Sequence, residues 1–256
     1  MIIYTCITDG YDQIPDHYYD PEVKYVLFYR GEIERKGPWE FIKLDVDIEC
    51  PRRLSAYPKI NPHKFFDEGE DTVWIDACYK MTKEFVDIAK TKFPFTILRH
   101  SNHFSFYDEM LEGFECSFFG FDQGIKLTKT LYEDGYDFRK YRSPLGTILY
   151  RTINDTARTF GDSWWYYFEI GVNRDQISLD AALQLNKLQP EIVENRDECG
   201  VLLGHYNKVG RRGKHPQRGE LDQWKYRSEF INAMKSYVGM SRIYIKHKHD
   251  FMRSIQ

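Results

Sequence analysis

The pattern of apolar and polar positions predicts five strands in the first hundred residues. Each is a short run rich in β-branched and aromatic side chains, bounded by polar or turn-forming residues. The predicted strands are Met1–Thr8, Lys24–Tyr29, Glu40–Leu44, Thr72–Asp76 and Phe95–Arg99. Because helical or turn-rich stretches separate these runs, the pattern indicates an α/β fold with a central sheet.

Helical spacing of apolar positions follows in the middle and at the end of the chain. The predicted helices are Arg52–Tyr57, Thr82–Lys92, Gln123–Asp134, Asp155–Thr159, Arg174–Leu185 and Leu221–Tyr237. Trp164 and Trp165 are expected just ahead of the helix at Arg174. Residues 140–147 (KYRSPLGT) are a candidate boundary between two halves, and the glycine-rich, basic stretch 204–219 predicts a mobile loop.

Length and cysteine content narrow the class of protein. A chain of 256 residues can bury a sizeable core without disulfides. Its five cysteines are scattered, odd in number and without CxxC spacing, so neither a disulfide framework nor a zinc ribbon is expected. The first residues read as a strand rather than a signal peptide, and no run of about 18 apolar residues occurs. We expect a soluble, cytoplasmic protein that does not contact a membrane.

Charge is distributed unevenly along the chain. The formal net charge is −3, but residues 205–256 carry +8 and the remaining residues −11. This asymmetry suggests an anionic partner for the end of the chain, with an ordinary solvated basic face as the alternative. We therefore expect one domain over 1–204 and a basic carboxyl-terminal segment over 205–256 that packs on it.

Two predicted strands end in residues suited to ligand binding. Thr8, Asp9 and Tyr11 follow the first strand, and Asp76 stands at the end of the fourth, where open α/β sheets bind ligands. An Asx turn at Asp9 and a helix cap at Asp76 are the structural alternatives. The chain lacks GxGxxG after its first strand and lacks GxxxxGK[ST], which disfavours dinucleotide dehydrogenases and P-loop phosphotransferases.

Cations and a second metal-ligating residue accompany these positions. Arg53 and Lys59 precede the Asp76 strand and suit a diphosphate, although surface basic residues on a helix are equally expected. His205 follows an apolar run and would join Asp76 as a ligand if that run ends in the same cleft. Mg²⁺ or Mn²⁺ shared with a diphosphate needs few protein ligands.

The order of these motifs resembles a known family. TDGYD, Arg53 and Lys59, DTVWIDA, HSNHFSFYDE and SWWYYFEIGVNRDQISLDAAL together look like the glycosyltransferase-like domain of plant mucilage and pollen-turgor proteins, bacteria and phages, first catalogued as a domain of unknown function. The likeness covers roughly residues 1–205. More distantly, the layout is similar to glycogenin-like transferases. The resemblance implies a single GT-A-like nucleotide-sugar-binding domain with a mixed central sheet and a helical, basic carboxyl-terminal segment.

The resemblance also implies roles for individual residues, and one departure from the pattern. The nucleoside would contact Thr8, Asp9 and Tyr11, and the diphosphate and sugar would contact Arg53, Lys59 and Lys208. Asp76 and His205 would bind Mn²⁺ or Mg²⁺, and Asp175 and Gln176, with Arg174, would face the transferred sugar. Asp76 is followed by Ala77 and Cys78 where the distant relatives carry a second aspartate, which questions the two-carboxylate metal site.

The reaction implied is transfer of a sugar from a nucleotide-sugar, most simply a UDP-sugar, to an acceptor hydroxyl. Candidate acceptor-binding residues are His100, His103, Trp164, Trp165, Arg211, Arg212 and Lys214. Structural roles are the alternative for His100 and His103, and a local ion pair at the helix start is the alternative for Arg174 and Asp175. The basic segment suggests nucleic acid as acceptor, such as a hydroxylated base in phage DNA, with a polysaccharide or other glycan as the alternative. A non-catalytic nucleic-acid- or sugar-binding module on the same fold is the competing hypothesis.

Overall fold

A computed structural model describes residues 1–10, 12–91, 95–99, 105–115, 118–142, 144–170 and 174–194, with the isolated residues 229 and 232. The chain forms two compact units. The first, which we call the sheet unit, draws its described residues from the stretches Met1–Arg99, Leu145–Trp165 and Gln189–Lys214. The second, the helical unit, draws its described residues from His100–Pro144, Tyr166–Leu188 and His215–Gln256.

The sheet unit is built on seven strands in the order β3-β2-β1-β4-β6-β5-β7. Their bounds are β1 (Ile2–Thr8), β2 (Lys24–Arg30), β3 (Glu40–Lys43), β4 (Asp71–Ile75), β5 (Thr96–Arg99), β6 (Pro144–Thr152) and β7 (Glu191–Glu194). β1 pairs in parallel with β2 and β4, and β6 runs antiparallel to β4. The expected α/β fold with a mixed central sheet is confirmed.

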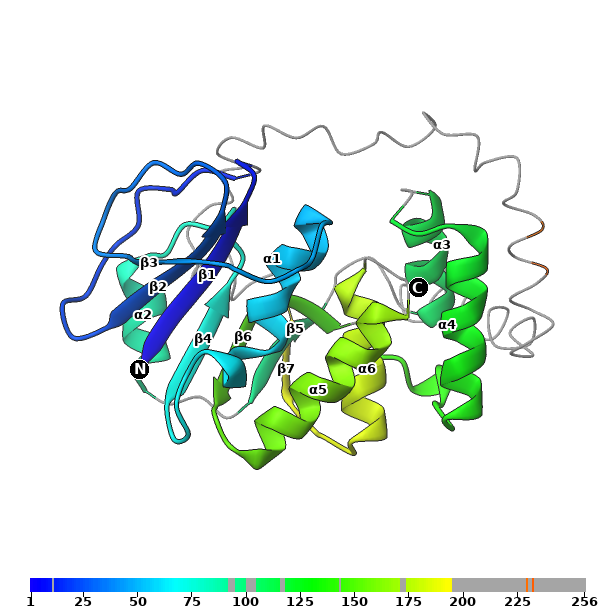
Figure 1. The fold of residues 1–256 in the computed structure, drawn as a ribbon. Coiled ribbons are helices and arrows are strands. Elements are labelled where there is room, and N and C mark those ends of the chain that lie inside the picture. The colour runs from blue at the N-terminus through cyan, green and yellow to red at the C-terminus, as the bar shows by residue number, and fades with distance from the viewer. Residues whose placement is uncertain are drawn as a thin grey trace, which may run out of the picture. The chain divides into compact units, whose positions relative to one another are not determined.

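Alternating side chains of these strands pack on two different layers. Ile3 and Val73 belong to a buried apolar cluster that also contains Phe85 of α2 (Lys83–Ala89). On the opposite face of the sheet, Tyr4 lies beside Trp74 in register, and α1 (Pro51–Ile60) covers them. Figure 1 shows α1 and α2 on opposite sides of the strands.

The helical unit contains α3 (Phe106–Glu115), α4 (Phe121–Glu133), a short 3₁₀ helix η2 (Phe138–Lys140) and α6 (Asp175–Leu185). Its core is strongly aromatic. The buried members include Phe106, Tyr107, Met110, Phe114, Leu127, Leu131, Tyr136, Phe138, Ile177 and Ala181. Apolar residues that recur every three or four positions along α3 and α4 supply a large part of this cluster, as expected for helices with one buried face.

All five strands predicted in the first hundred residues are present within two residues of their predicted bounds. The chain passes between the units at Pro144 and Leu145, within the stretch 140–147 expected to separate two halves, and residues 144–152 form β6, a strand that the sequence did not predict. The predicted helix Asp155–Thr159 is too short. α5 (Asp155–Glu169) continues through Trp164 and Trp165, because Phe160, Trp164 and Phe168 share one buried helical face. The predicted loop 204–219 and the helix Leu221–Tyr237 lie outside the described residues, except positions 229 and 232.

Within the described residues, no helix combines the length and the apolar character needed to cross a bilayer.

Candidate functional site

The strand order creates a topological switch point between β1 and β4. From β1 the chain proceeds to β2 and β3 on one side, and then returns to place β4 on the other side of β1. Ligands of open α/β sheets bind beyond the carboxyl ends of the strands at such a point. Thr8 and Asp9 end β1, and Asp76 directly follows β4. Three of the residues chosen from the sequence therefore lie at the edge of the sheet where a ligand is expected.

Asp76 is held by a cation and an indole. The Lys59 ammonium lies 3.4 Å from Asp76 Oδ1, and Trp74 Nε1 donates a hydrogen bond of 2.7 Å to the same oxygen. Lys59 Nζ also lies 5.7 Å from the centre of the Trp74 ring. Only 6% of Lys59 is exposed, so the stem of this lysine is buried and its charge is held at Asp76. The structure thus brings together Asp76 and Lys59, which the sequence proposed as separate ligand contacts.

A second buried cation, which sequence reasoning missed, lies behind Lys59. Arg151 on β6 is 3% exposed, and its Nη2 donates to the Tyr4 hydroxyl at 2.6 Å and to the Lys59 carbonyl oxygen. Burial lowers the pKa of Arg151, and Tyr4 opposes that shift. Burial also raises the pKa of Tyr4, so its hydroxyl stays neutral. A charged residue near the end of a strand gives no signal in the sequence that separates it from a surface arginine.

The turn after β1 is held by a different ion pair. Asp9 has φ of 53° and Gly10 has φ of 68°, a tight turn that aspartate tolerates better than most residues. Arg30, at the end of β2, donates from Nη2 to Asp9 Oδ2 at 2.7 Å and from Nε to Asp9 Oδ1 at 3.2 Å. This hydrogen bonding to Asp9 raises the pKa of Arg30. The Asp9 side chain is 42% exposed, so solvent and ligands still reach its carboxylate. Tyr11 lies outside the described residues.

The first turn of α1 adjoins the end of β1 and is positively charged. The Thr8 hydroxyl donates to the Pro51 carbonyl oxygen at 3.0 Å, which joins the two elements. Thr8 is buried, so its hydroxyl serves this contact. The turn contains Arg52 and Arg53 and no acidic residue. Since a helix amino terminus already carries a partial positive charge, two arginines there make a local field that favours an anion.

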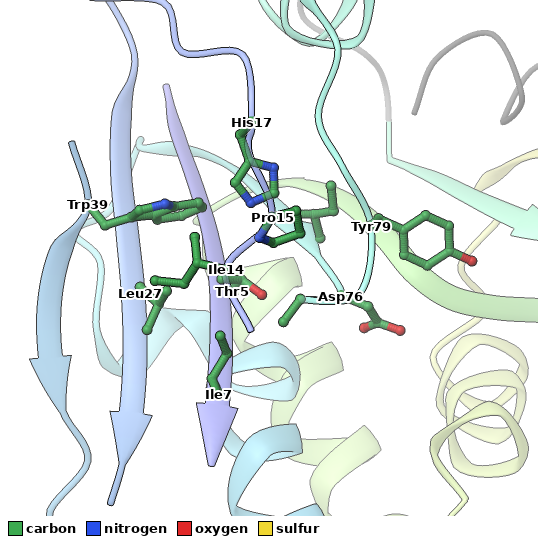
Figure 2. Close-up of a pocket in the computed structure, with 11 residues that line it drawn as sticks. Thr5, Ile7, Ile14, Pro15, His17, Leu27, Trp39, Asp76 and Tyr79 are labelled. Atoms are coloured by element: carbon green, nitrogen blue, oxygen red, sulfur yellow. The ribbon is translucent and has the colours of Figure 1, made fainter. Parts of the chain in front are cut away.

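A narrow hollow lies under the segment that follows β1 (Figure 2). Thr5, His17 and Trp39 line it, and Asp76 stands at its edge with the carboxylate directed away. This hollow is too tight to admit a water molecule. We therefore treat it as a gap in packing. His17 Nδ1 accepts the Met81 backbone N–H at 3.1 Å, and burial lowers the His17 pKa to about 4, so this ring is neutral at physiological pH.

The residues expected to bind a metal were tested against the structure. Among the residues it describes, no three His, Cys, Asp or Glu side chains are grouped so as to hold an ion. Asp76 is one of the two expected ligands, and an ammonium 3.4 Å from its Oδ1 repels a divalent cation. The other expected ligand, His205, lies outside the described residues. The described side chains do not form a metal site by themselves, and no catalytic step is assigned to a metal.

The helical unit contains the residues expected to face the transferred sugar. Asp175 begins α6, and Arg174 immediately before it donates from Nε to the buried Glu109 of α3. Arg174 also stacks over Phe118, with 5.1 Å from Cζ to the ring centre. Arg174 is therefore engaged in tying α6 to α3. The Gln176 amide oxygen is buried without a hydrogen-bond partner among the described residues.

A buried polar cluster one turn further along α6 was also missed. Asp180 is 0% exposed and accepts hydrogen bonds from the Tyr136 hydroxyl, from Gln184 at 2.8 Å and from Arg142 at 3.2 Å. Burial raises the Asp180 pKa against these donors. We regard this cluster as structural, because its members connect α6 to the segment that precedes β6.

Of the proposed acceptor-binding residues, the structure describes only the two tryptophans. Trp164 is 0% exposed and packs on Phe160, so it offers no surface to an acceptor. Trp165 is half-buried, and its ring meets Tyr57 of α1 edge-on at 5.0 Å. The remaining acceptor candidates lie outside the described residues: His100, His103, Arg211, Arg212 and Lys214. Lys208, expected at the diphosphate, lies outside them too.

No protein-family model matches this chain, and no curated protein matches it. Among solved structures, the chain is similar to the galactosyltransferase LgtC in complex with donor and acceptor sugar analogues. The two chains are 10% identical, the TM-score is 0.44, and the match covers 92% of this chain and 96% of that one. No functional conclusion is drawn from a likeness at this level.

Proposed function

We propose that this protein is a GT-A-like glycosyltransferase that moves a sugar from a nucleotide-sugar donor to an acceptor hydroxyl. The observation that carries the proposal is the charge arrangement at the switch point between β1 and β4. Lys59 lies at Asp76, and the first turn of α1 carries Arg52 and Arg53 without an acidic residue. A diphosphate is an anion of the kind such a site favours.

The proposed chemistry assigns a task to each described residue. Cleavage of the bond between sugar and nucleotide leaves its electron pair on the diphosphate, and Arg53 and Lys59 stabilise that negative charge. Asp9, which Arg30 holds in place, accepts hydrogen bonds from ribose hydroxyls. Asp175 and Gln176 orient the transferred sugar. The acceptor hydroxyl attacks the anomeric carbon and its proton passes to an oxygen of the departing diphosphate, and holding the two reactants together supplies part of the acceleration.

The same proposal extends to the identity of the donor and of the metal cofactor. We take a UDP-sugar as the donor and Mn²⁺ or Mg²⁺ as the cofactor. An ion held by Asp76 and His205 would have to displace the Lys59 ammonium from Asp76 Oδ1. Both assignments come from the sequence resemblance. They are tested by comparing UDP-, GDP- and CMP-sugars, each with and without added Mn²⁺ after treatment with EDTA.

For the acceptor we propose nucleic acid, with Arg211, Arg212 and Lys214 among its contacts. The support is the +8 charge of residues 205–256. Binding to a DNA duplex should then weaken steeply with salt, with a slope of about −0.9 for each neutralised phosphate. Charge reversal at the three residues should flatten the slope and leave donor hydrolysis unchanged. If the protein does not bind DNA at low salt and glycosylates a glycan instead, this part of the proposal is wrong.

Slow hydrolysis of the donor in water is the decisive test between a transferase and a non-catalytic binding module. The purified full-length chain should release nucleotide diphosphate from at least one nucleotide-sugar. Asp76→Asn, which keeps the side chain's size, should lower that rate about 100-fold, because Asp76 holds the Lys59 ammonium that stabilises the leaving diphosphate. Asp71→Asn on the same strand is the matched control. Nucleotide binding without any turnover would favour the binding module.

A further inference from the structure

Arg151 is a buried cation without a carboxylate partner in the described part of the chain. Its Nε and Nη1 atoms are buried and form no hydrogen bond with any described residue. Only Nη2 is used, by the Tyr4 hydroxyl and the Lys59 carbonyl oxygen. Burying a charged group with most of its N–H donors unsatisfied is costly. Burying methionine or leucine at this position would cost less free energy, so the arginine calls for a functional explanation.

The Lys59 carbonyl oxygen belongs to the last turn of α1, which needs outside support. Lys59 is the second-last residue of the helix, so its carbonyl has no partner within the helix. Pro58, inside the same turn, lacks an N–H and removes one further helical hydrogen bond. A guanidinium is well suited to this place, because it donates to the carbonyl and its charge opposes the negative end of the helix dipole. Arg151 thus fastens the end of α1 to the sheet.

Fixing the backbone of Lys59 decides where its ammonium lies. A lysine has four rotatable bonds, so its charge is localised only if both ends of the side chain are held. At the far end, Trp74 and Asp76 contact the ammonium. At the near end, Arg151 holds the carbonyl oxygen of the same residue.

We propose that Arg151 is a positioning residue that holds Lys59 for the diphosphate of the donor. This inference rests on the proposed function and goes beyond it, because Arg151 is buried and acts through Lys59. Replacing Arg151 should therefore weaken the binding of a diphosphate, either free or carried by a nucleotide.

Calorimetric binding of inorganic pyrophosphate and of UDP to the full-length chain tests the proposal. Arg151→Met removes the donors and the charge at similar length, and we expect affinity for both ligands to fall about tenfold, as for the loss of one charge-assisted hydrogen bond. Arg151→Lys keeps the charge without the fork and should lose less. Lys59→Met should weaken binding at least as much, and adding Arg151→Met to it should cause little further loss, because Arg151 acts through Lys59.

A purely structural role for Arg151 predicts another result. The variants would melt at lower temperature yet bind pyrophosphate with wild-type affinity well below that temperature, or their effects would add to those of Lys59→Met. Either result overturns the proposal. If Arg151→Met does not fold, the same double-mutant cycle is run with Arg151→Lys, which keeps the buried cation. A wild-type chain that binds neither UDP nor pyrophosphate would contradict the proposed function itself, whereas binding unaffected by Arg151 would contradict only this inference.

Discussion

Gly161 of α5 lies directly against the carbonyl oxygen of Ile60, the last residue of α1. A methyl group on the Gly161 Cα would stand 2.7 Å from that oxygen and 2.8 Å from the His63 ring. Real Cβ atoms do not approach a backbone oxygen this closely, so the contact between these two helices requires glycine. The close approach brings α5 onto the end of α1, the same turn that carries Lys59.

Gly161→Ala should lower the free energy of unfolding by about 1–3 kcal/mol, the usual cost of overpacking. The direction of this change in stability tests the close contact, because glycine-to-alanine changes inside helices otherwise stabilise a protein by about 0.5–1 kcal/mol. Thr159→Ala, on the exposed side of the same helix, is the control and should shift stability by at most about 0.5 kcal/mol. Urea denaturation measures both variants. A more stable Gly161→Ala protein would show that the two helices are further apart than described.

Removing either partner of the Lys59–Asp76 pair should have unequal effects. Asp76→Ala leaves a buried ammonium without its carboxylate and should cost about 1–3 kcal/mol of stability. Lys59→Met should cost less, because Asp76 is 29% exposed in its side chain and keeps the Trp74 hydrogen bond. If Asp76 stood at the strand end only to bind a ligand, replacing it would leave the free energy of unfolding unchanged. Its ion pair with Lys59 predicts a loss of stability instead. Thermal melts of the two variants and of Asp76→Asn measure the difference, and a Lys59→Met protein that is the less stable would refute it.

Asp175→Asn addresses the proposed contact with the donor sugar. If the carboxylate acts mainly in the transition state, kcat for donor hydrolysis should fall about 100-fold while UDP affinity changes by less than about twofold. Asp175 also begins α6, where a negative charge stabilises the helix by about 0.3–1 kcal/mol. A melting temperature lowered with unchanged kcat would therefore assign the residue to the helix alone.

His17 should make stability depend on pH. Burial, with Lys36 adding repulsion, lowers its pKa to about 4, below the value of about 6.5 in the unfolded chain. The unfolded state therefore binds the proton first as pH falls, and the contribution of this residue is lost between about pH 6.5 and pH 4. The loss should be below about 3–4 kcal/mol, since one pKa unit corresponds to about 1.36 kcal/mol, and solvent contact makes it smaller.

The variant His17→Gln isolates the pH-dependent contribution of His17 to stability, because the glutamine amide oxygen can still accept the Met81 N–H. The difference in unfolding free energy between wild type and variant should change with pH across that window and be constant above pH 7. Subtracting the two curves removes His63, whose pKa is also lowered by burial. A difference that does not vary with pH would mean that the His17 ring is protonated in the folded protein as readily as in the unfolded one.

The sequence predicted the strands well wherever a run had strong β-branched and aromatic content. It failed at β6, whose Pro144-Leu145-Gly146 start has the composition of a turn. The pairing of this strand with β4 across about 80 residues of chain is a tertiary effect that no local pattern contains. The aromatic second half of α5 was missed for a related reason, since its residues have modest helix propensity and are helical because they are buried.

At the site, the sequence correctly marked Asp76 as following a strand and Lys59 as a cation of the same region. Trp74 could have been found, because residues two apart on a strand share a face. Arg151 and Tyr4 could not, since they meet Lys59 only through the packing of β6, β1 and α1. The same limit applies to the Arg174–Glu109 pair, whose partners are separated by 65 residues.

The position of β6 also has a kinetic consequence. β6 separates β4 from β5 in the sheet, yet it is synthesised after α3 and α4. During translation the first five strands emerge without the one that must lie between two of them. Non-local pairing of this kind slows folding and leaves strand edges exposed to other chains. The nascent chain should therefore depend on chaperones until residue 152 has left the ribosome, and truncation before that point should favour aggregation over a smaller native fold.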